Sequence, residues 1–413
     1  MSEDRLRHAA ALIQRIETSE PVLRAFTAYD PVRIRAEALG APQGPLSGLS
    51  VGVKDIIDTA DYATGHGSPI YDGWHPRSDA SCVTLLRAAG AVCVGKTVTT
   101  EFAFFRAGAT VNPYDHARTP GGSSSGSATA VAAGMIDIGL ASQTAASLTR
   151  PASYCGIVGF KPSYGRYASA GIKSLAPSFD TLGTMTRDVA TAALADGVLK
   201  GPVAAPTPLV AQAPKRIGLC RTPHWAEAGP ATQAALEQAA GLFGAQVEVA
   251  EIDLSAFADA ADLHITIMSY EAVQALAWEY THRRDMLSPQ ISALLEAGRG
   301  ISYATYRTAL ARAQDLRARM AELTPPGTVL LAPAAPDVAP LLSEGTGSPL
   351  FSRLWTLLRL PTITLPGLVS ATGLPVGVQL LGPFGEDEAL LAHAAWAETV
   401  LPARPVPPAV SLG

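Results

Sequence analysis

The sequence predicts a layered α/β fold, and three observations support this prediction. Apolar segments with strand character alternate with segments of helical periodicity along most of the 413 residues, which is the order expected when helices pack on a sheet. Hydrophobic residues make up 48% of the chain and charged residues 16%, so a large core can be buried. The sequence contains no stretch of 18 consecutive apolar residues, and we therefore expect no membrane-spanning segment.

The first hundred residues contain three local patterns. Residues 3–39 have apolar residues at helical spacing and are predicted to be helical. The segment LSVGVKDIID is predicted to be a strand with Lys54 at its centre. After it, either Ser78 or Asp79 would cap a helix that ends at Gly90, and AVCV would form a short buried strand.

The alternation continues to the C-terminus. Residues 121–150 begin with a Gly/Ser loop, run through a predicted helix of small residues and end in a second tight turn. The Pro/Ala-rich segment 202–214 is interpreted as a surface loop rather than a domain linker, because apolar strands resume directly after it. Further strands are predicted at 156–160, 217–220, 328–332 and 376–381, and helices at 230–243, 265–283, 303–322 and 387–400.

Charge and cysteine content exclude several classes of protein. The formal net charge is −5, and without a Lys/Arg-rich run we expect no nucleic-acid or anionic-membrane partner. The four cysteines have no metal-binding spacing, so neither a metal site nor a disulfide framework is predicted. The N-terminal MSEDRLRHAA is charged and lacks the apolar core of a signal peptide, which leads us to expect a cytoplasmic protein.

The Gly/Ser loop is the main indication of chemistry, and it has more than one interpretation. Residues 122–126 match G-x-S-x-G, the nucleophile elbow of α/β-hydrolases, with Ser124 as nucleophile. That fold would need an acid and a histidine further along the chain, and no local pattern marks either. A phosphate-binding loop is a third interpretation. Its signal is weak, because no Gly-Lys-Ser or Gly-Lys-Thr follows the glycines. A loop without chemical function also remains open.

Lys54 is the second indication. Only six of the 31 basic residues are lysines, and this one lies among Val51, Val53, Ile56 and Ile57. A lysine at a strand end usually holds its ammonium in solvent. Burial in an apolar segment would instead lower its pKa and make the neutral amine a base.

Together these segments resemble the amidase signature family. The resemblance covers nearly the whole chain, including VGVKDIID, the Gly/Ser loop, RPASYCGIVGFKPSYGR, SFDTLGTMTRD and GLPVGVQLLGP. It implies a catalytic triad of Lys54, Ser123 and Ser147, in which the two serines are 24 positions apart, and a cis peptide bond between Gly122 and Ser123. It also implies a single α/β/α domain with a central mixed, twisted β-sheet, a homodimer, and no metal or organic cofactor.

The resemblance divides the chain into three parts of one domain, 1–413. The signature core would occupy about 50–190, the variable substrate-pocket region about 200–325, and the C-terminal return to the core about 326–400.

Chemistry assigns roles to the three residues. A neutral Lys54 would take the proton of Ser123, while Ser123 takes that of Ser147, because a hydroxyl is a poor nucleophile until a base removes its proton. Ser147 would then attack the amide carbonyl, and the reversed relay would protonate the leaving nitrogen. The resemblance implies that the backbone N–H groups of residues 144–147, namely Thr144, Ala145, Ala146 and Ser147, form the oxyanion hole.

The turn before Ser147 departs from the family's commonest pattern. Gln143 replaces an acid, and the arginine expected two positions after the nucleophile is displaced to Arg150. We expect these changes to compensate each other, with Gln143, Arg150 and Ser124 in supporting roles. Ala145 and Ala146 replace glycines, and alanine resists the positive φ that glycine accepts.

The predicted substrate is a small neutral amide, with anilides, esters or carbamates as further candidates. By resemblance Phe102, Phe104, Phe105, Met268 and Trp355 are expected to line the pocket, whereas His264 and His282 are interpreted as structural or surface residues. Two alternatives stay open: the amidase (A) subunit of a tRNA-dependent amidotransferase, and a non-catalytic scaffold on the same fold. The segment GTGSPLFSRLWTLLRLP favours the stand-alone enzyme, because it lacks an acid to hold an α-amino group.

Overall fold

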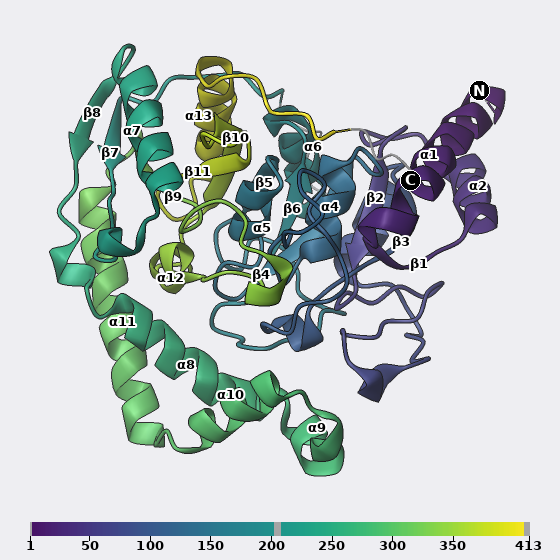
Figure 1. Ribbon diagram of the computed structural model, residues 1–413, viewed down its shortest axis with the longest axis horizontal. Helices are drawn as coiled ribbons and strands as arrows, with labels where there is room; N and C mark the ends of the chain where they lie inside the picture. The colour runs from purple at the N-terminus through teal and green to yellow at the C-terminus, as the bar shows by residue number, and fades with distance from the viewer. Residues whose placement is uncertain (1, 202–207, 409–413) are drawn as a thin grey trace.

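The computed structural model describes residues 2–201 and 208–408, and these residues fold around an 11-stranded β-sheet (Figure 1). From one edge to the other the strands are β1 (Phe26–Tyr29), β3 (Val92–Thr97), β2 (Ser50–Lys54), β4 (Ile138–Gln143), β6 (Thr181–Thr186), β5 (Val158–Lys161), β10 (Thr362–Val369), β11 (Pro375–Leu381), β9 (Thr328–Pro333), β7 (Arg216–Leu219) and β8 (Glu248–Glu251). The sheet is mixed. Strand β2 pairs in parallel with β3 and β4, β7 pairs in parallel with β8 and β9, and the other neighbours are antiparallel.

Helices cover the sheet on both sides. The α-helices are α1 (Ser2–Leu23), α2 (Pro31–Gly40), α3 (Ser81–Ala88), α4 (Ser125–Ala132), α5 (Thr149–Tyr154), α6 (Val189–Leu199), α7 (Pro230–Gly244), α8 (Ala260–Ala275), α9 (Ala277–His282), α10 (Pro289–Arg299), α11 (Tyr303–Leu323), α12 (Leu350–Leu357) and α13 (Asp387–Val400). Short 3₁₀ turns lie at 69–71, 101–103, 225–227, 255–257, 284–286 and 342–344. This architecture confirms the predicted layered α/β fold with a central mixed sheet.

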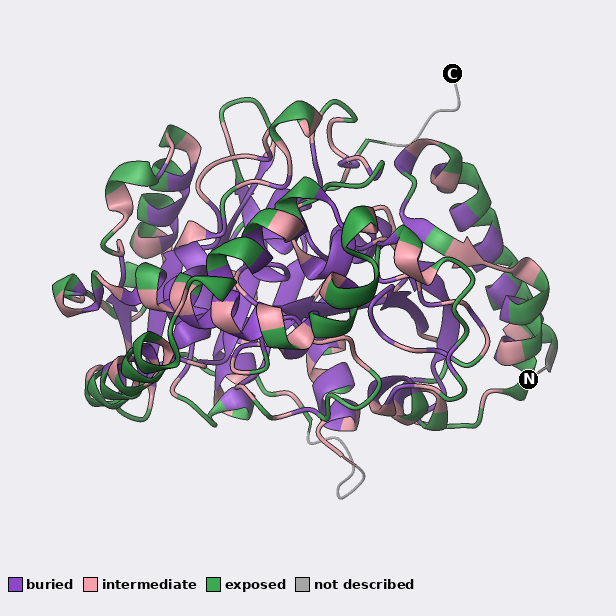
Figure 2. Cartoon of the chain, turned by 90° about the horizontal axis from the view of Figure 1, so that it is seen from below, coloured by how far each residue is buried: buried purple, intermediate pink, exposed green. Residues whose placement is uncertain are grey.

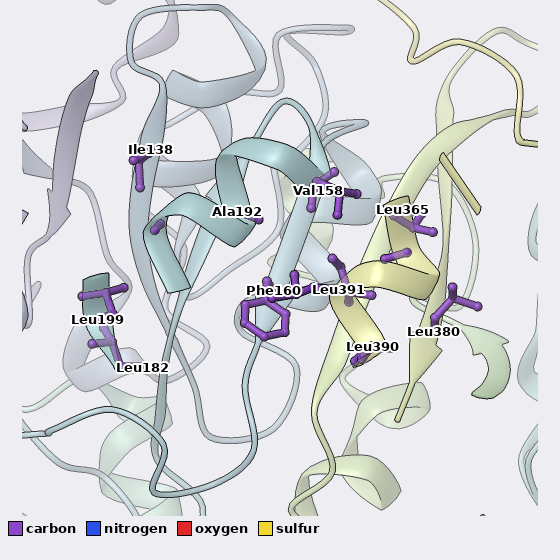
Figure 3. Close-up of a cluster of buried hydrophobic side chains, with 14 of the residues drawn as sticks. Ile138, Val158, Phe160, Leu182, Ala192, Leu199, Leu365, Leu380, Leu390 and Leu391 are labelled. Atoms are coloured by element: carbon purple, nitrogen blue, oxygen red, sulfur yellow. The ribbon is translucent and has the colours of Figure 1, made fainter. Parts of the chain in front are cut away.

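The largest core lies between the sheet and helices α3, α6, α7 and α13. Figure 3 shows part of it, where Phe160 of β5 lies near Leu390 and Leu391 of α13, and Leu182 of β6 lies near Leu199 of α6. On the opposite face α4 packs on β2 and β4, and α5 packs on β5 and β10. Figure 2 shows the result, with buried residues along the sheet and exposed residues on the outer helix faces. The strands that carry the candidate site therefore have both faces covered.

A third apolar cluster forms outside the sheet. Helices α8, α10, α11 and α12 pack against one another, and α8 contacts the other three. In Figure 1 these helices extend from the end of the sheet that carries β7 and β8. Within the described part of the chain, no helix is long and apolar enough to cross a membrane.

Several predicted boundaries were wrong. The helix expected over 3–39 is interrupted, because Arg24 has φ +52° and the following residues form β1 before Asp30 caps α2. Lys54 ends its strand rather than lying at the centre. Helix α3 has Ala80 at its N-cap, while the side chain of Asp79 bonds Arg87 and the N–H of Ala60.

Two long predicted helices were also wrong. The small-residue helix after the Gly/Ser loop ends at Ala132, and the fully buried strand β4 follows. The helix expected over 265–283 is divided at Leu276 into α8 and α9. Of the predicted loop at 202–214, residues 202–207 lie outside the described residues, and the rest has no helix or strand.

Candidate active site

Lys54 ends β2, the third strand from the β1 edge of the sheet, and its side chain is fully buried. Its Nζ lies 2.7 Å from Ser123 Oγ and 2.8 Å from Ser142 Oγ. Burial lowers the pKa of Lys54 to about 7, although the nearby Asp180 carboxylate acts in the opposite direction. The amine therefore loses its proton near neutral pH while it contacts a serine hydroxyl.

The Gly/Ser loop brings Ser123 to this amine. The Gly122–Ser123 peptide bond is cis, in agreement with the resemblance. Ser124 lies at the N-cap of α4, is fully buried, and its Oγ donates to Ser142 O at 3.4 Å. A nucleophile elbow requires an accessible serine, so the interpretation of Ser124 as the nucleophile is wrong for this fold.

Ser147 lies in the turn between β4 and α5. Its side chain and that of Ser123 line the same pocket. Its Oγ has no hydrogen-bond partner among residues 2–201 and 208–408, whereas its carbonyl accepts from Ser124 N at 3.3 Å. The second serine is thus anchored by its backbone while its hydroxyl is available to a ligand.

In the backbone of residues 144–147 the carbonyl groups and the N–H groups differ in their hydrogen bonding. Every carbonyl in this turn accepts a hydrogen bond: from His264 Nε2 to Thr144 (2.7 Å), from Thr356 Oγ1 to Ala145 (2.8 Å), from Arg150 N to Ala146 (3.1 Å), and from Ser124 N to Ser147 (3.3 Å). In contrast, none of the four N–H groups has an acceptor within the described chain. Unpaired buried N–H groups are rare in proteins, and this set borders the pocket that contains Ser147.

The two alanines fit this turn without strain. Neither Ala145 nor Ala146 is among the non-glycine residues with positive φ. The conformation that alanine resists is therefore not required here, which removes the sequence-based argument for a non-catalytic scaffold.

Gln143 and Arg150 tie the turn to its surroundings. Gln143 Oε1 accepts from the N–H groups of Leu148 and Thr149 at the start of α5, and its Nε2 donates to Thr356 at 3.1 Å. Arg150 donates instead to Gly122 O at 2.6 Å and to Gly347 O. A neutral amide at 143 needs no counter-ion, so Arg150 is free to hold the serine loop.

A chain of polar residues supports Thr144. Its hydroxyl donates to the half-buried carboxylate of Asp180 at 2.6 Å, and its carbonyl is held by His264. Since Arg353 Nη1 is only a donor, its 2.8 Å contact to His264 Nδ1 requires the proton of His264 on Nε2. Burial, together with the charge of Arg353, lowers the pKa of His264 well below its ordinary value, and burial raises the pKa of Asp180.

A small pocket opens in front of Ser147. Phe104, Phe105 and Met268 line it, together with the turn 144–147 and Arg150. Phe102 and Trp355 do not line it, because both are buried in the apolar cluster around α8 and α12. His282 is exposed on α9, in contrast to the buried and hydrogen-bonded His264. Within the described ranges, no group of three or more His, Cys, Asp or Glu side chains could hold a metal ion.

Sequence reasoning missed several residues of this site. Ser142 contacts Lys54, His264 and Thr356 contact the turn, and Arg353 contacts His264. These contacts arise only through the fold. Asp180 lies within the segment SFDTLGTMTRD, but its sequence neighbourhood does not indicate its contact with Thr144. A second cavity of about 360 Å³ shares Ala103, Thr144 and Leu175 with the pocket and is also lined by Ser142 and Asp180.

Comparisons with known proteins agree with this geometry. The sequence pattern of the amidase family matches residues 7–391. The chain is 34% identical to the A subunit of glutamyl-tRNA(Gln) amidotransferase from Anaeromyxobacter sp. (strain K), over 96% of this chain and 93% of that one. It is 33% identical to the corresponding protein of Thermus thermophilus, over 94% and 92%.

Several solved structures are similar to this chain in both sequence and fold. A crystal structure of an amidase is 30% identical with a TM-score of 0.87 and covers 96% of both chains. A structure from a vestigial protein complex, linked to the origins of an s-triazine catabolic enzyme, is 27% identical with a TM-score of 0.88, over 97% and 96%. The peptide amidase of Stenotrophomonas maltophilia is 29% identical with a TM-score of 0.84, over 98% and 95%. This chain therefore belongs to the amidase family and is a hydrolase of amide C–N bonds.

Proposed function

We propose that this protein hydrolyses a small amide through an acyl-enzyme on Ser147, with Ser123 as proton relay and Lys54 as general base. The observation that carries the proposal is the 2.7 Å contact between Lys54 Nζ and Ser123 Oγ, behind a pocket in which the Ser147 hydroxyl has no partner within the described chain. A buried amine with a pKa of about 7 is suited to take a proton at neutral pH.

The reaction proceeds in two halves. Ser147 Oγ attacks the amide carbonyl as its proton passes to Ser123, and the proton of Ser123 passes to Lys54. The tetrahedral intermediate then breaks its C–N bond, and the relay returns a proton to the departing amine or ammonia. Water attacks the resulting ester by the same relay, which releases a carboxylic acid and restores the Ser147 hydroxyl.

The negative oxygen of the tetrahedral intermediate would be stabilised by the turn before Ser147. The unpaired N–H groups of residues 144–147 supply donors, and the hydrogen bonds to their carbonyls hold them in place before substrate binds. Preorganised donors of this kind contribute about 3–4 kcal/mol each to the transition state in serine hydrolases.

A second candidate is the amidase subunit of a tRNA-dependent amidotransferase. The relatives favour it over the stand-alone enzyme expected from the sequence, since the proteins from Anaeromyxobacter and Thermus bear that name and are 33–34% identical over nearly their whole length. Under this alternative the same Ser147 chemistry would release ammonia from glutamine for a partner chain. For the stand-alone enzyme we propose a homodimer instead of a complex with a different partner chain.

A fluorophosphonate probe followed by peptide mapping tests the mechanism. Labelling of Ser147 supports it, labelling of Ser124 contradicts it, and an absence of labelling on active-site serines favours a scaffold. Ammonia release by the purified chain from glutamine and from simple amides then separates the two candidates, because the stand-alone enzyme needs no partner chain.

We also propose that the chain is a single amidase domain that acts in the cytoplasm. All four cysteines are buried and free, which suits a reducing compartment.

A further inference from the structure

We propose that the amide substrate also carries a carboxylate and that Arg353 binds this group. The inference rests on the proposed function, because it names the substrate class of the same site. It differs from the neutral amide expected from the sequence, where nothing indicated that Arg353 reaches the pocket.

Arg353 lies on α12 and lines the pocket in front of Ser147 while only 8% exposed. A guanidinium has five N–H donors. Within the described chain, the one hydrogen bond of Arg353 goes to His264 Nδ1, and it forms no ion pair. Because His264 is a neutral partner, it accepts a hydrogen bond from the guanidinium without compensating its charge.

The pocket as a whole is cationic. Arg150 is a second lining guanidinium, and no Asp or Glu is among the described residues that line this pocket. Burial lowers the pKa of both arginines to about 10, and for Arg353 the charge of Arg150 adds to the effect. Since a buried charge is costly without a partner, an anionic ligand would be favoured here.

Two partly buried arginines elsewhere in the described chain are paired with acids. Arg87 contacts the carboxylates of Glu37, Asp61 and Asp79, and Arg166 makes a two-point contact with Asp196. Arg353 is more deeply buried than either and has no acid partner in the described chain, so an anionic ligand would supply the charge compensation that these two arginines already have.

Arg150 is less suited to this role. Its two Nη atoms donate to the carbonyls of Gly122 and Gly347 and to Thr346 Oγ1, so they hold the serine loop to the 346–347 segment. Arg353 has no comparable set of acceptors in the described part of the chain, and its planar fork matches a carboxylate.

The remaining lining limits the substrate further. Phe104, Phe105, Leu175 and Met268 add apolar surface to the same pocket, which suits a substrate whose carboxylate and amide are joined by a short hydrocarbon chain. An α-ammonium would find no carboxylate partner among the described residues of this lining, so we expect a half-amide of a dicarboxylic acid to bind better than glutamine.

Binding to Ser147→Ala tests the inference without turnover. Titration calorimetry would compare succinamic acid, succinamide and glutamine. A charged hydrogen-bonded contact predicts about 10- to 100-fold tighter binding of succinamic acid than of succinamide. Adding Arg353→Gln should reduce this ratio to near one, while Arg353→Lys should retain part of it.

Two control variants separate charge from structure. Arg317 is a half-buried arginine whose pKa is likewise lowered to about 10. It donates to Leu357 O and does not line this pocket. Arg317→Gln should therefore keep the ratio of affinities for succinamic acid and succinamide. Thr356→Val removes the support of Ala145 without changing charge or the contact of Arg353 with His264, and should lower kcat for both amides in the active enzyme while the ratio of their affinities stays the same.

Equal affinity of Ser147→Ala for succinamic acid and succinamide would overturn the inference, as would an unchanged ratio in Arg353→Gln. If the fluorophosphonate probe labels Ser147 of the natural protein, such a result refutes only the proposed carboxylate of the substrate. If Ser147 is not labelled, the proposed function itself fails.

Discussion

The Nζ of Lys54 and the Oγ of Ser123 lie 2.7 Å apart, although the two residues are 69 positions apart in the sequence. Strand β2 ends at the lysine, and the Gly/Ser loop before α4 carries the serine to it. The contact places a base with a pKa of about 7 directly against a hydroxyl that borders the pocket. The chemistry expected of the site depends on this relationship.

Replacing the nucleophile or the base should remove activity without unfolding the protein. Ser147→Ala is expected to abolish amide turnover, and Lys54→Ala to lower kcat by about 10²–10⁴-fold, the usual contribution of a general base. Steady-state assays on a simple amide, with circular dichroism to confirm folding, measure both. Full activity in either variant would refute the assigned roles.

Activity should rise with pH around neutrality. Lys54 acts as a base only when it is unprotonated, and its pKa is about 7, so kcat/KM should increase about tenfold per pH unit well below 7 and level off above it. A pH–rate profile on a neutral amide tests this, because the substrate itself does not titrate. A profile that stays flat between about pH 5.5 and 8.5, where the protein remains folded, would exclude Lys54 as the base.

The same lysine should make stability depend on pH. Its pKa is about 7 when folded and about 10.4 when unfolded, so between these values the unfolded chain binds more protons and the free energy of unfolding rises with pH. Lys54→Met removes this dependence. The variant should therefore gain stability relative to the natural protein at about pH 7.5, and this advantage should shrink at about pH 9.5. Urea unfolding at the two pH values measures the difference, and an advantage that grows with pH would contradict the lowered pKa.

Thr356 is expected to position the oxyanion donors. Its hydroxyl donates to Ala145 O and accepts from Gln143, so Thr356→Val should lower kcat by about tenfold or more, with a smaller change in KM, because the lost support matters most in the transition state. Thr399→Val, at an exposed position in α13, is the matched control. An equal effect of both variants would show that the hydroxyl of Thr356 has no such role.

Restoring glycine in the turn should bring no gain. Ala145 and Ala146 have no positive φ, so Ala145→Gly and Ala146→Gly are expected to leave kcat no higher. Each should also lower the free energy of unfolding by about 0.4–1 kcal/mol, because glycine increases the entropy of the unfolded chain. Thermal unfolding and amide assays check both parts. A large rise in kcat in either variant would mean that alanine strains the natural turn.

Local sequence patterns were sufficient for the layered fold and for part of the site. Hydrophobic periodicity and turn residues located β3, β7, β9, β11 and most of the longer helices, because these signals depend on near neighbours. They failed at β4, where an apolar run of small residues fits a helix as well as a buried strand. They failed again at β1, where one residue with positive φ ends α1.

The resemblance of the sequence to the amidase signature family was enough to suggest amide chemistry at Lys54, Ser123 and Ser147. Only the tertiary structure decided what surrounds them. Thr356 lies 211 positions from the carbonyl that it holds, and Arg353 lies 89 positions from His264. Contacts between residues so far apart produce no periodic pattern in the sequence. Burial is likewise a property of the whole fold, and it lowers the pKa of Lys54. The fold also leaves Arg353 without an acid among the described residues that line the pocket.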